Sequence, residues 1–161
     1  MTESRQGEPL YYGMFKHADA KAGYAVWLPM GWTGLKMGNG HKGAVFFPES
    51  EAQDTYFSCE SFKLRFAVTE QDVSVLREGF DAGLRALPGV EVESQDETVT
   101  PTLIGFDARF TFVEREAKRK RWVRNIYWGK LQIVFIAQGS TPAEFDYWLP
   151  MFYHTMMTFE V

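Results

Sequence analysis

Two spacings of apolar side chains divide the chain into predicted strands and predicted helices. Residues 24–28 and 44–47 are short apolar runs that each end at a proline, which is typical of strands. Residues 106–112 alternate apolar and polar side chains, as a strand with one buried face does, and residues 122–128 form a further strand candidate. Residues 131–137 are apolar at both parities, which indicates a strand covered on both faces and therefore close to the centre of a sheet.

The segment 56–68 also alternates, but its apolar positions change parity. They are odd up to Cys59 and even from Phe62 onward. Because a shift of one residue moves every following side chain to the other face of a strand, we expect a bulge or bend near residues 60–61. Residues 90–99 show a weaker strand pattern.

Helical spacing occurs twice. A capping box at residues 69–72 precedes a one-sided apolar pattern over 73–87, which a Pro-Gly pair then stops. Residues 141–144 place a threonine cap, a proline at the first helical position and a glutamate in register, and an apolar stripe follows over 145–159. Pro150 lies inside this second pattern and is expected to kink the helix.

The order of these elements predicts the fold class. Strands are followed by a helix, by a run of antiparallel strands and by a final helix, without the βα alternation of a parallel sheet. We therefore expect an α+β fold in which an antiparallel sheet of about six strands packs between helices. A length of 161 residues predicts a single domain over 1–161, with residues 1–20 as an extended or loosely ordered segment.

Three short motifs occur along the chain, with the predicted amphipathic helix between the first and the second. They are LPMGW at residues 28–32, L-x-G-x-x-A at 103–108 and F-x-x-W-L-P-x-F at 145–152. In this order they resemble the PsbP-like superfamily, which includes PsbP, DcrB-like bacterial proteins and a Ran-binding import factor. The resemblance covers about residues 24–159 and implies an antiparallel sheet sandwiched between helices. It also implies a binding or assembly role rather than catalysis, and it transfers no catalytic residue to this chain.

Charge adds one strong local feature. Six of the seventeen basic residues lie within residues 115–124 beside a single acid, so this window carries +5 in a chain of net charge −4. Since strands are predicted on both sides, residues 115–121 should include an exposed hairpin tip. The candidate partner-binding residues are Arg115, Lys118, Arg119, Lys120, Arg121, Trp122 and Arg124.

An acidic protein partner fits this polarised surface better than a nucleic acid, because the remaining −9 would repel phosphates. An anionic membrane surface is a further alternative, and so is a purely solubilising hairpin that protects a sheet edge. The outer side of the last helix offers a second candidate surface. It carries Tyr147, Met151, Tyr153, His154 and Met157, and residues 10–15 would equally cover it.

Other apparent motifs favour structural roles. The GxGxxG pattern at residues 38–43 precedes a predicted strand rather than a helix, so we interpret it as a glycine hairpin and not a dinucleotide site. The three histidines lack the spacing of a helical metal site, and we expect neither a metal nor a cofactor. Gly79 and Gly83 are expected to allow close packing of the first helix on the sheet. Cys59, the only cysteine, lies on an apolar strand and is expected to be a buried thiol.

These observations favour a non-enzymatic binding or assembly module that uses the basic hairpin and the last helix. The alternative is a small enzyme with a pocket between sheet and helix, where Cys59, a histidine or loop carboxylates would act. The candidate carboxylates are Glu49, Glu51, Asp54, Glu91, Glu93, Asp96 and Glu97. A single cysteine, no signal-like start and no apolar run long enough to span a bilayer lead us to expect a cytoplasmic protein.

Overall fold

The computed structural model describes residue 5, residues 7–10 and residues 12–161. In chain order the strands and helices are β1 (Met14–Asp19), β2 (Tyr24–Pro29), β3 (Thr33–Lys36), β4 (Lys42–Phe47), β5 (Tyr56–Lys63), a 3₁₀ turn (Glu70–Asp72), α1 (Val73–Arg85), β6 (Glu91–Val99), β7 (Ile104–Glu114), β8 (Ala117–Trp128), β9 (Leu131–Gly139) and α2 (Pro142–Met157).

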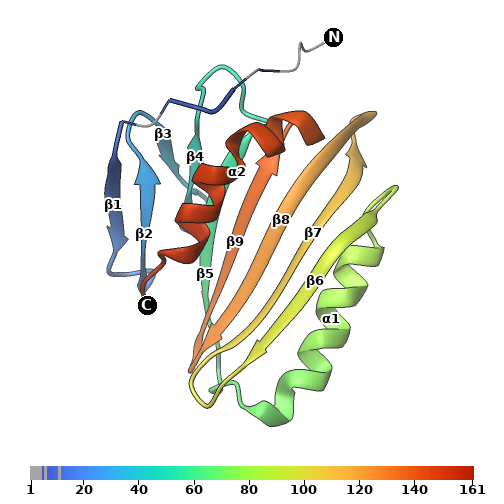
Figure 1. Ribbon diagram of the computed structural model, residues 1–161. Coiled ribbons are helices and arrows are strands. Elements are labelled where there is room, and N and C mark those ends of the chain that lie inside the picture. The colour runs from blue at the N-terminus through green and yellow to red at the C-terminus, as the bar shows by residue number, and fades with distance from the viewer. Residues whose placement is uncertain (1–4, 6, 11) are drawn as a thin grey trace.

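Seven strands form one antiparallel sheet in the order β3-β4-β5-β9-β8-β7-β6, and β1 and β2 form a separate antiparallel pair (Figure 1). The predicted α+β class with an antiparallel sheet is therefore confirmed. β9 is the middle strand of the seven. Its position confirms the prediction drawn from apolar residues at both parities.

The two helices lie on opposite faces of the large sheet (Figure 1). α2 packs on the face that carries Phe57, Trp122 and Phe135, which we call the α2 face. α1 packs on the other face, where Phe106 and Phe110 of β7 point, which we call the α1 face. Large apolar side chains fill both interfaces, so burial of aromatic area is the main force that holds the layers together.

Local signals start both helices. The Asp72 carboxylate accepts a hydrogen bond from the Thr69 amide at 2.8 Å, which closes the predicted capping box before α1. The Thr141 hydroxyl accepts from the Glu144 amide at 3.1 Å and caps α2, whose first residue is Pro142. Both predicted helix starts are confirmed.

A bulge or bend was predicted near residues 60–61, and the bulge is wrong. β5 pairs with β4 and β9 in unbroken register through residues 60–61 and then ends at Lys63. The even apolar parity arises because Leu64 and Val68 belong to a segment beyond the strand, where they pack beside α1. The register shift of this sheet lies instead in β6, between Val92 and Ser94.

The segment expected to be extended or loosely ordered, residues 1–20, includes the regular strand β1. Residues 1–4, 6 and 11 of that segment lie outside the described residues. Within the described part of the chain, neither helix has both the length and the apolar character needed to cross a bilayer.

Candidate protein-binding site

The β7–β8 hairpin carries the basic cluster. β7 ends at Glu114 and β8 begins at Ala117, so only Arg115 and Glu116 form the turn. Their φ angles are positive, 49° and 63°, as in a two-residue hairpin turn. Residues 115–121 therefore include the predicted hairpin tip, but the tip is limited to Arg115 and Glu116, because residues 117–121 lie in a strand paired with β7. Polar side chains on both faces of this end of β8 hid the alternation that marks a strand.

Strand geometry divides the cluster between the two faces of the sheet, because successive side chains point to opposite sides. Arg119 and Arg121 lie on the α1 face, where the Arg121 guanidinium stands over the Phe112 ring. The α2 face receives Lys118, Lys120, Trp122 and Arg124. Six of the seven candidate residues thus form two separate rows, and Arg115 lies in the turn, so the cluster is not one continuous patch.

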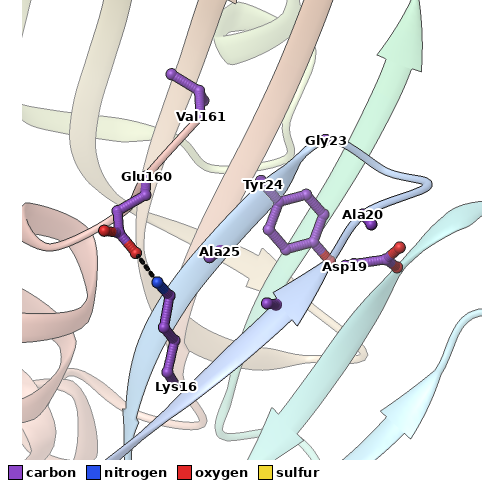
Figure 2. Close-up of a pocket in the computed structure, with 9 residues that line it drawn as sticks. Lys16, Asp19, Ala20, Gly23, Tyr24, Ala25, Glu160 and Val161 are labelled. Atoms are coloured by element: carbon purple, nitrogen blue, oxygen red, sulfur yellow. Dashed lines mark ion pairs between the residues drawn. The ribbon is translucent and has the colours of Figure 1, made fainter.

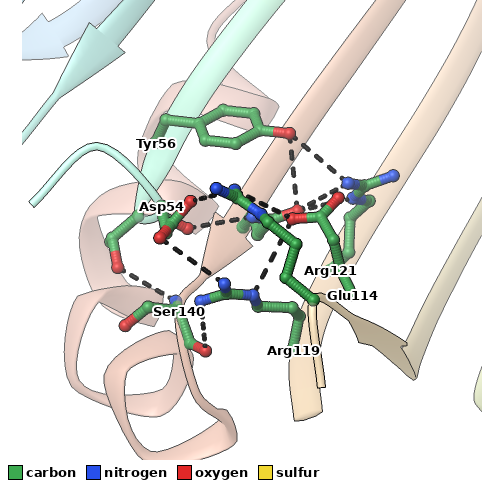
Figure 3. A network of polar contacts seen from close by, with 9 residues as sticks. Asp54, Tyr56, Glu114, Arg119, Arg121 and Ser140 are labelled. Carbon is green, nitrogen blue, oxygen red and sulfur yellow. Dashed lines mark hydrogen bonds and ion pairs between the residues drawn. The ribbon is translucent and has the colours of Figure 1, made fainter. Parts of the chain in front are cut away.

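Figure 3 shows the row on the α1 face, where Arg119 and Arg121 reach the β4–β5 loop and the end of β9. Arg119 donates from Nη1 to the Ser140 carbonyl at 3.0 Å, and its Nη2 lies 3.4 Å from Asp54 Oδ2. Arg121 donates twice to Gln138 Oε1, at 2.6 and 3.0 Å. Gln138 in turn donates to the Asp54 carbonyl at 2.9 Å. These bonds fix the loop before β5 against the hairpin.

The row on the α2 face is also paired within the chain. Lys120 Nζ lies 2.9 Å from Glu93 and 3.4 Å from Asp146. Burial alone would lower the pKa of Lys120, but these two carboxylates outweigh it and the pKa is raised. Arg124 donates to the Met156 carbonyl at 2.6 Å, and burial lowers the pKa of its guanidinium. Lys120 and Arg124 therefore secure α2 to the sheet.

Trp122 is part of the core rather than a surface anchor. Its side chain is only 2% exposed, and its Nε1 donates to Asp107 Oδ2 at 3.2 Å. The Tyr153 ring of α2 stacks on it with centroids 6.2 Å apart, and the Arg109 guanidinium lies 4.2 Å from its centroid. A partner in contact with this surface would meet Arg109 or Tyr153 before it met Trp122.

Arg115 and Lys118 are the cations that extend furthest into solvent, with side chains 70% and 57% exposed. Arg115 pairs with Asp54 at 2.7 Å, and Lys118 lies 3.9 Å from Glu91. Every basic residue of the cluster faces an acceptor of its own chain, so the +5 of the sequence window is largely compensated in the fold. Asp54 neutralises part of this charge and Gln138 accepts hydrogen bonds from Arg121. Both are distant in sequence, and neither was predicted as a partner of the cluster.

The N-terminal segment covers the first half of the outer side of α2. Arg5 pairs with Glu144 at 2.9 Å and stands over the Tyr147 ring, 4.9 Å from its centroid. Tyr153 and Met157, further along α2, are 52% and 46% exposed. Arg5, and not the predicted segment 10–15, thus makes the contacts with the first half of this surface, and Leu10 and Tyr12 are each 74% exposed. The second half is open, and its use by a partner stays a prediction.

Cys59 is fully buried, and burial raises the pKa of its thiol to about 12. The expected packed thiol is confirmed, and a nucleophilic role is not supported. His17 is held against Phe46 and burial lowers its pKa, whereas His41, just before β4, pairs with Glu60 of β5. Across residues 5, 7–10 and 12–161, no group of three or more His, Cys, Asp or Glu side chains is placed to hold a metal ion.

Most of the candidate loop carboxylates act as ion-pair partners. Those paired with a basic side chain are Glu49, Asp54, Glu91, Glu93 and Glu97. The glycine pattern at residues 38–43 forms the β3–β4 connection, so the hairpin interpretation is confirmed. The expected packing role of Gly79 and Gly83 is wrong, because both face open space.

Two of the hollows that lie outside the basic cluster are larger than the others there. One, of about 340 Å³, is open and lies beside β1 and β2, where Lys16 and Glu160 pair at 2.7 Å (Figure 2). The other, of about 390 Å³, lies between the start of α1 and the end of β5 and includes Leu76 and Tyr127. It is a pocket between sheet and helix, as the enzymatic alternative requires, but neither Cys59 nor any histidine lines it.

Comparison with solved structures identifies the fold. The structure is similar to the solution structure of cyanobacterial PsbP (CyanoP) from Synechocystis sp. PCC 6803, with a TM-score of 0.60 and 16% identity over 99% of this chain and 98% of that chain. It is also similar to a Pseudomonas aeruginosa protein of unknown function, with a TM-score of 0.56 and 11% identity over 91% of this chain and 95% of that chain. No family model and no curated protein matches the sequence. The PsbP-like fold implied by the three sequence motifs is confirmed.

Proposed function

We propose that this chain, which has the PsbP-like fold, is a non-enzymatic module that binds an acidic segment of a protein partner at the end of the β7–β8 hairpin. Arg115 and Lys118 are the residues proposed to contact the partner. The observation that carries the proposal is that these two exposed cations project from a hairpin end that a buried polar network holds in place. A fixed site loses little conformational freedom when it binds.

The intramolecular ion pairs of Arg115 and Lys118 do not oppose this role strongly. Their partners Asp54 and Glu91 are 44% and 75% exposed. Exposed pairs of this kind contribute roughly 0 to 1 kcal/mol each, so carboxylates of a partner could replace them at small cost. Association would then be steered by charge and weakened by salt.

The other candidate residues support the site from within. Arg119 and Arg121 position the hairpin against the β4–β5 loop. Lys120, Trp122 and Arg124 secure the same strand to α2 and its neighbours. We assign them a positioning role, since most of their polar atoms already have partners. Because these cations are compensated, the proposal favours a protein over a nucleic acid, whose affinity depends on many free cations.

Charge reversal at the two exposed positions tests the proposal. Proteins captured from a cell lysate by the native chain are compared with those captured by the R115E/K118E variant and by a K21E/K36E control, which reverses two exposed lysines elsewhere. A true partner should be lost with the hairpin variant, kept with the control, and weakened by salt. Equal capture by all three proteins would refute a role for the hairpin end.

A flotation assay with lipid vesicles distinguishes a membrane surface from a protein partner. The native chain should not float with vesicles that contain anionic lipid, even at low salt, because carboxylates of the same chain already pair with the basic rows. Flotation that disappears in the R115E/K118E variant would instead favour a membrane surface as the ligand.

A further inference from the structure

The segment that joins β5 to α1 lies at the end of the molecule opposite the β7–β8 turn (Figure 1). An exposed apolar side chain and an apolar hollow occur together in this segment. The chain leaves β5 at Lys63 and forms two backbone hydrogen bonds with the β8–β9 turn. The Leu64 amide donates to the Lys130 carbonyl at 2.7 Å, and the Val68 amide donates to the Gly129 carbonyl at 3.0 Å. The residues between these two bonds form a short tethered loop.

Phe66 lies in the middle of this loop, and its side chain is 81% exposed. Val75 on the first turns of α1 is 72% exposed, and Phe62 at the end of β5 is 40% exposed. A group of large apolar side chains that remain in water typically marks an interaction surface. The loop is anchored at both ends, so Phe66 is presented with little freedom to fold back.

The adjacent hollow is large enough for an aromatic ring. It measures about 390 Å³, and its apolar lining includes Leu64, Val68, Val75 and Leu76. The exposed Phe66 ring also forms part of its wall. A closed apolar cavity of about 150 Å³ already holds benzene. The same surface therefore presents both a ring and a receptor for a ring.

The charges at the rim are self-complementary as well. Arg65 and Asp72 both line the hollow. Among the ion pairs of the described residues, none includes Arg65, and Asp72 accepts hydrogen bonds only from Thr69. In a two-fold symmetric contact every pairing occurs twice, so Arg65 of each copy can face Asp72 of the other.

We propose that this surface binds a second copy of the chain. Phe66 of each copy enters the hollow of the other, and two reciprocal Arg65–Asp72 pairs fix the register. This homodimer is independent of the partner proposed for the hairpin end. The β7–β8 turns lie at the far end of each copy and remain free, so the dimer would present two hairpin ends.

Sedimentation analysis from low to high micromolar concentration tests the dimer. The native chain should shift from monomer to dimer, and Phe66→Ala should weaken dimerisation about thirtyfold or more, as loss of a central anchor does. Leu35→Ala, which truncates a 52% exposed side chain on the edge strand β3, is the matched control and should dimerise normally. A native chain that stays monomeric over this concentration range would overturn the proposal. Binding of an apolar dye in the hollow would not rescue it.

A charge swap provides a sharper test of the register. Arg65→Glu should abolish dimerisation, because it places like charges together twice. Asp72→Arg should do the same, after its folding has been verified, since Asp72 also caps α1. An equimolar mixture of the two variants should form a heterodimer, because both cross-pairs are then of opposite charge. A mixture that remains monomeric although both variants are folded would overturn the proposed register. If Asp72→Arg does not fold, dimerisation of Arg65→Glu at the native affinity would have the same consequence.

Discussion

Reversal of charge at Arg119 should lower the stability of the fold far more than the same change at Lys118. The Arg119 side chain is 8% exposed, and its guanidinium lies against the Ser140 carbonyl, Asp54 and Glu114. Arg119→Glu removes the hydrogen bond to Ser140 and places a third carboxylate beside two others. Lys118 is 57% exposed on the opposite face, so Lys118→Glu is the matched control.

The size of the effect follows from burial. Breaking a fully buried ion pair costs about 3 to 5 kcal/mol, but Asp54 and Glu114 are 44% and 38% exposed and solvent screens part of the repulsion. We therefore expect Arg119→Glu to lower the free energy of unfolding by about 2 to 4 kcal/mol. Lys118→Glu should change it by no more than about 0.5 kcal/mol.

Urea unfolding followed by far-ultraviolet circular dichroism measures both variants. If the slope with urea is near 2 kcal/mol/M, Arg119→Glu should move the midpoint by about 1 to 2 M. Arg119→Met, which keeps the apolar stem and removes the charge, should cost less than the glutamate. Equal stability of Arg119→Glu and Lys118→Glu would refute the assignment of Arg119 to a buried network.

Two further predictions concern close packing and thiol ionisation. A Cβ on Gly139 would lie 2.3 Å from the Phe145 amide nitrogen, so Gly139→Ala should force α2 away and lower the free energy of unfolding by about 1 to 3 kcal/mol. Gly83→Ala, where the new methyl meets open space inside α1, should instead stabilise by about 0.5 to 1 kcal/mol, and thermal unfolding distinguishes the two. Cys59 has a pKa raised to about 12 by burial, so at mildly alkaline pH its thiolate population should be about a thousandfold below that of an ordinary thiol and a thiol reagent should label the native chain slowly. The same shift means that the neutral thiol is favoured in the folded state. Its contribution to stability is therefore present below pH 9 and is lost as pH rises from about 9 to 12. Fast labelling of the native protein would contradict the raised pKa.

The sequence predicted those elements that are specified by apolar patterns and capping residues within the element itself. The central position of β9 followed from apolar residues at both parities, and the start of α1 followed from the pair Thr69 and Asp72. β3 was missed because it is only four residues long and fully exposed, so no face of it is apolar. A strand of this kind exists through its pairing with β4 rather than through its own composition.

The candidate site was less predictable because its chemistry depends on distant residues. Charge counting along the chain placed six cations together, but it could not show that alternation along β8 separates them. Nor could it show that Asp54, which is 61 residues from Arg115, would compensate them. The exposure of Phe66 was not predicted either. The apolar side chains at even positions around it indicated that the strand continued through its segment.

The central position of β9 also has a consequence for how the molecule folds. β7, β8 and β9 follow one another through short turns, whereas Tyr56 of β5 must find Gln138 across 82 residues. Pairing over such a separation is slow compared with closing hairpins. Until β5 docks, β9 has an unpaired edge with apolar side chains on both faces, and such edges associate between molecules. Refolding should therefore become less efficient as protein concentration rises, although the finished sheet keeps this strand in its interior.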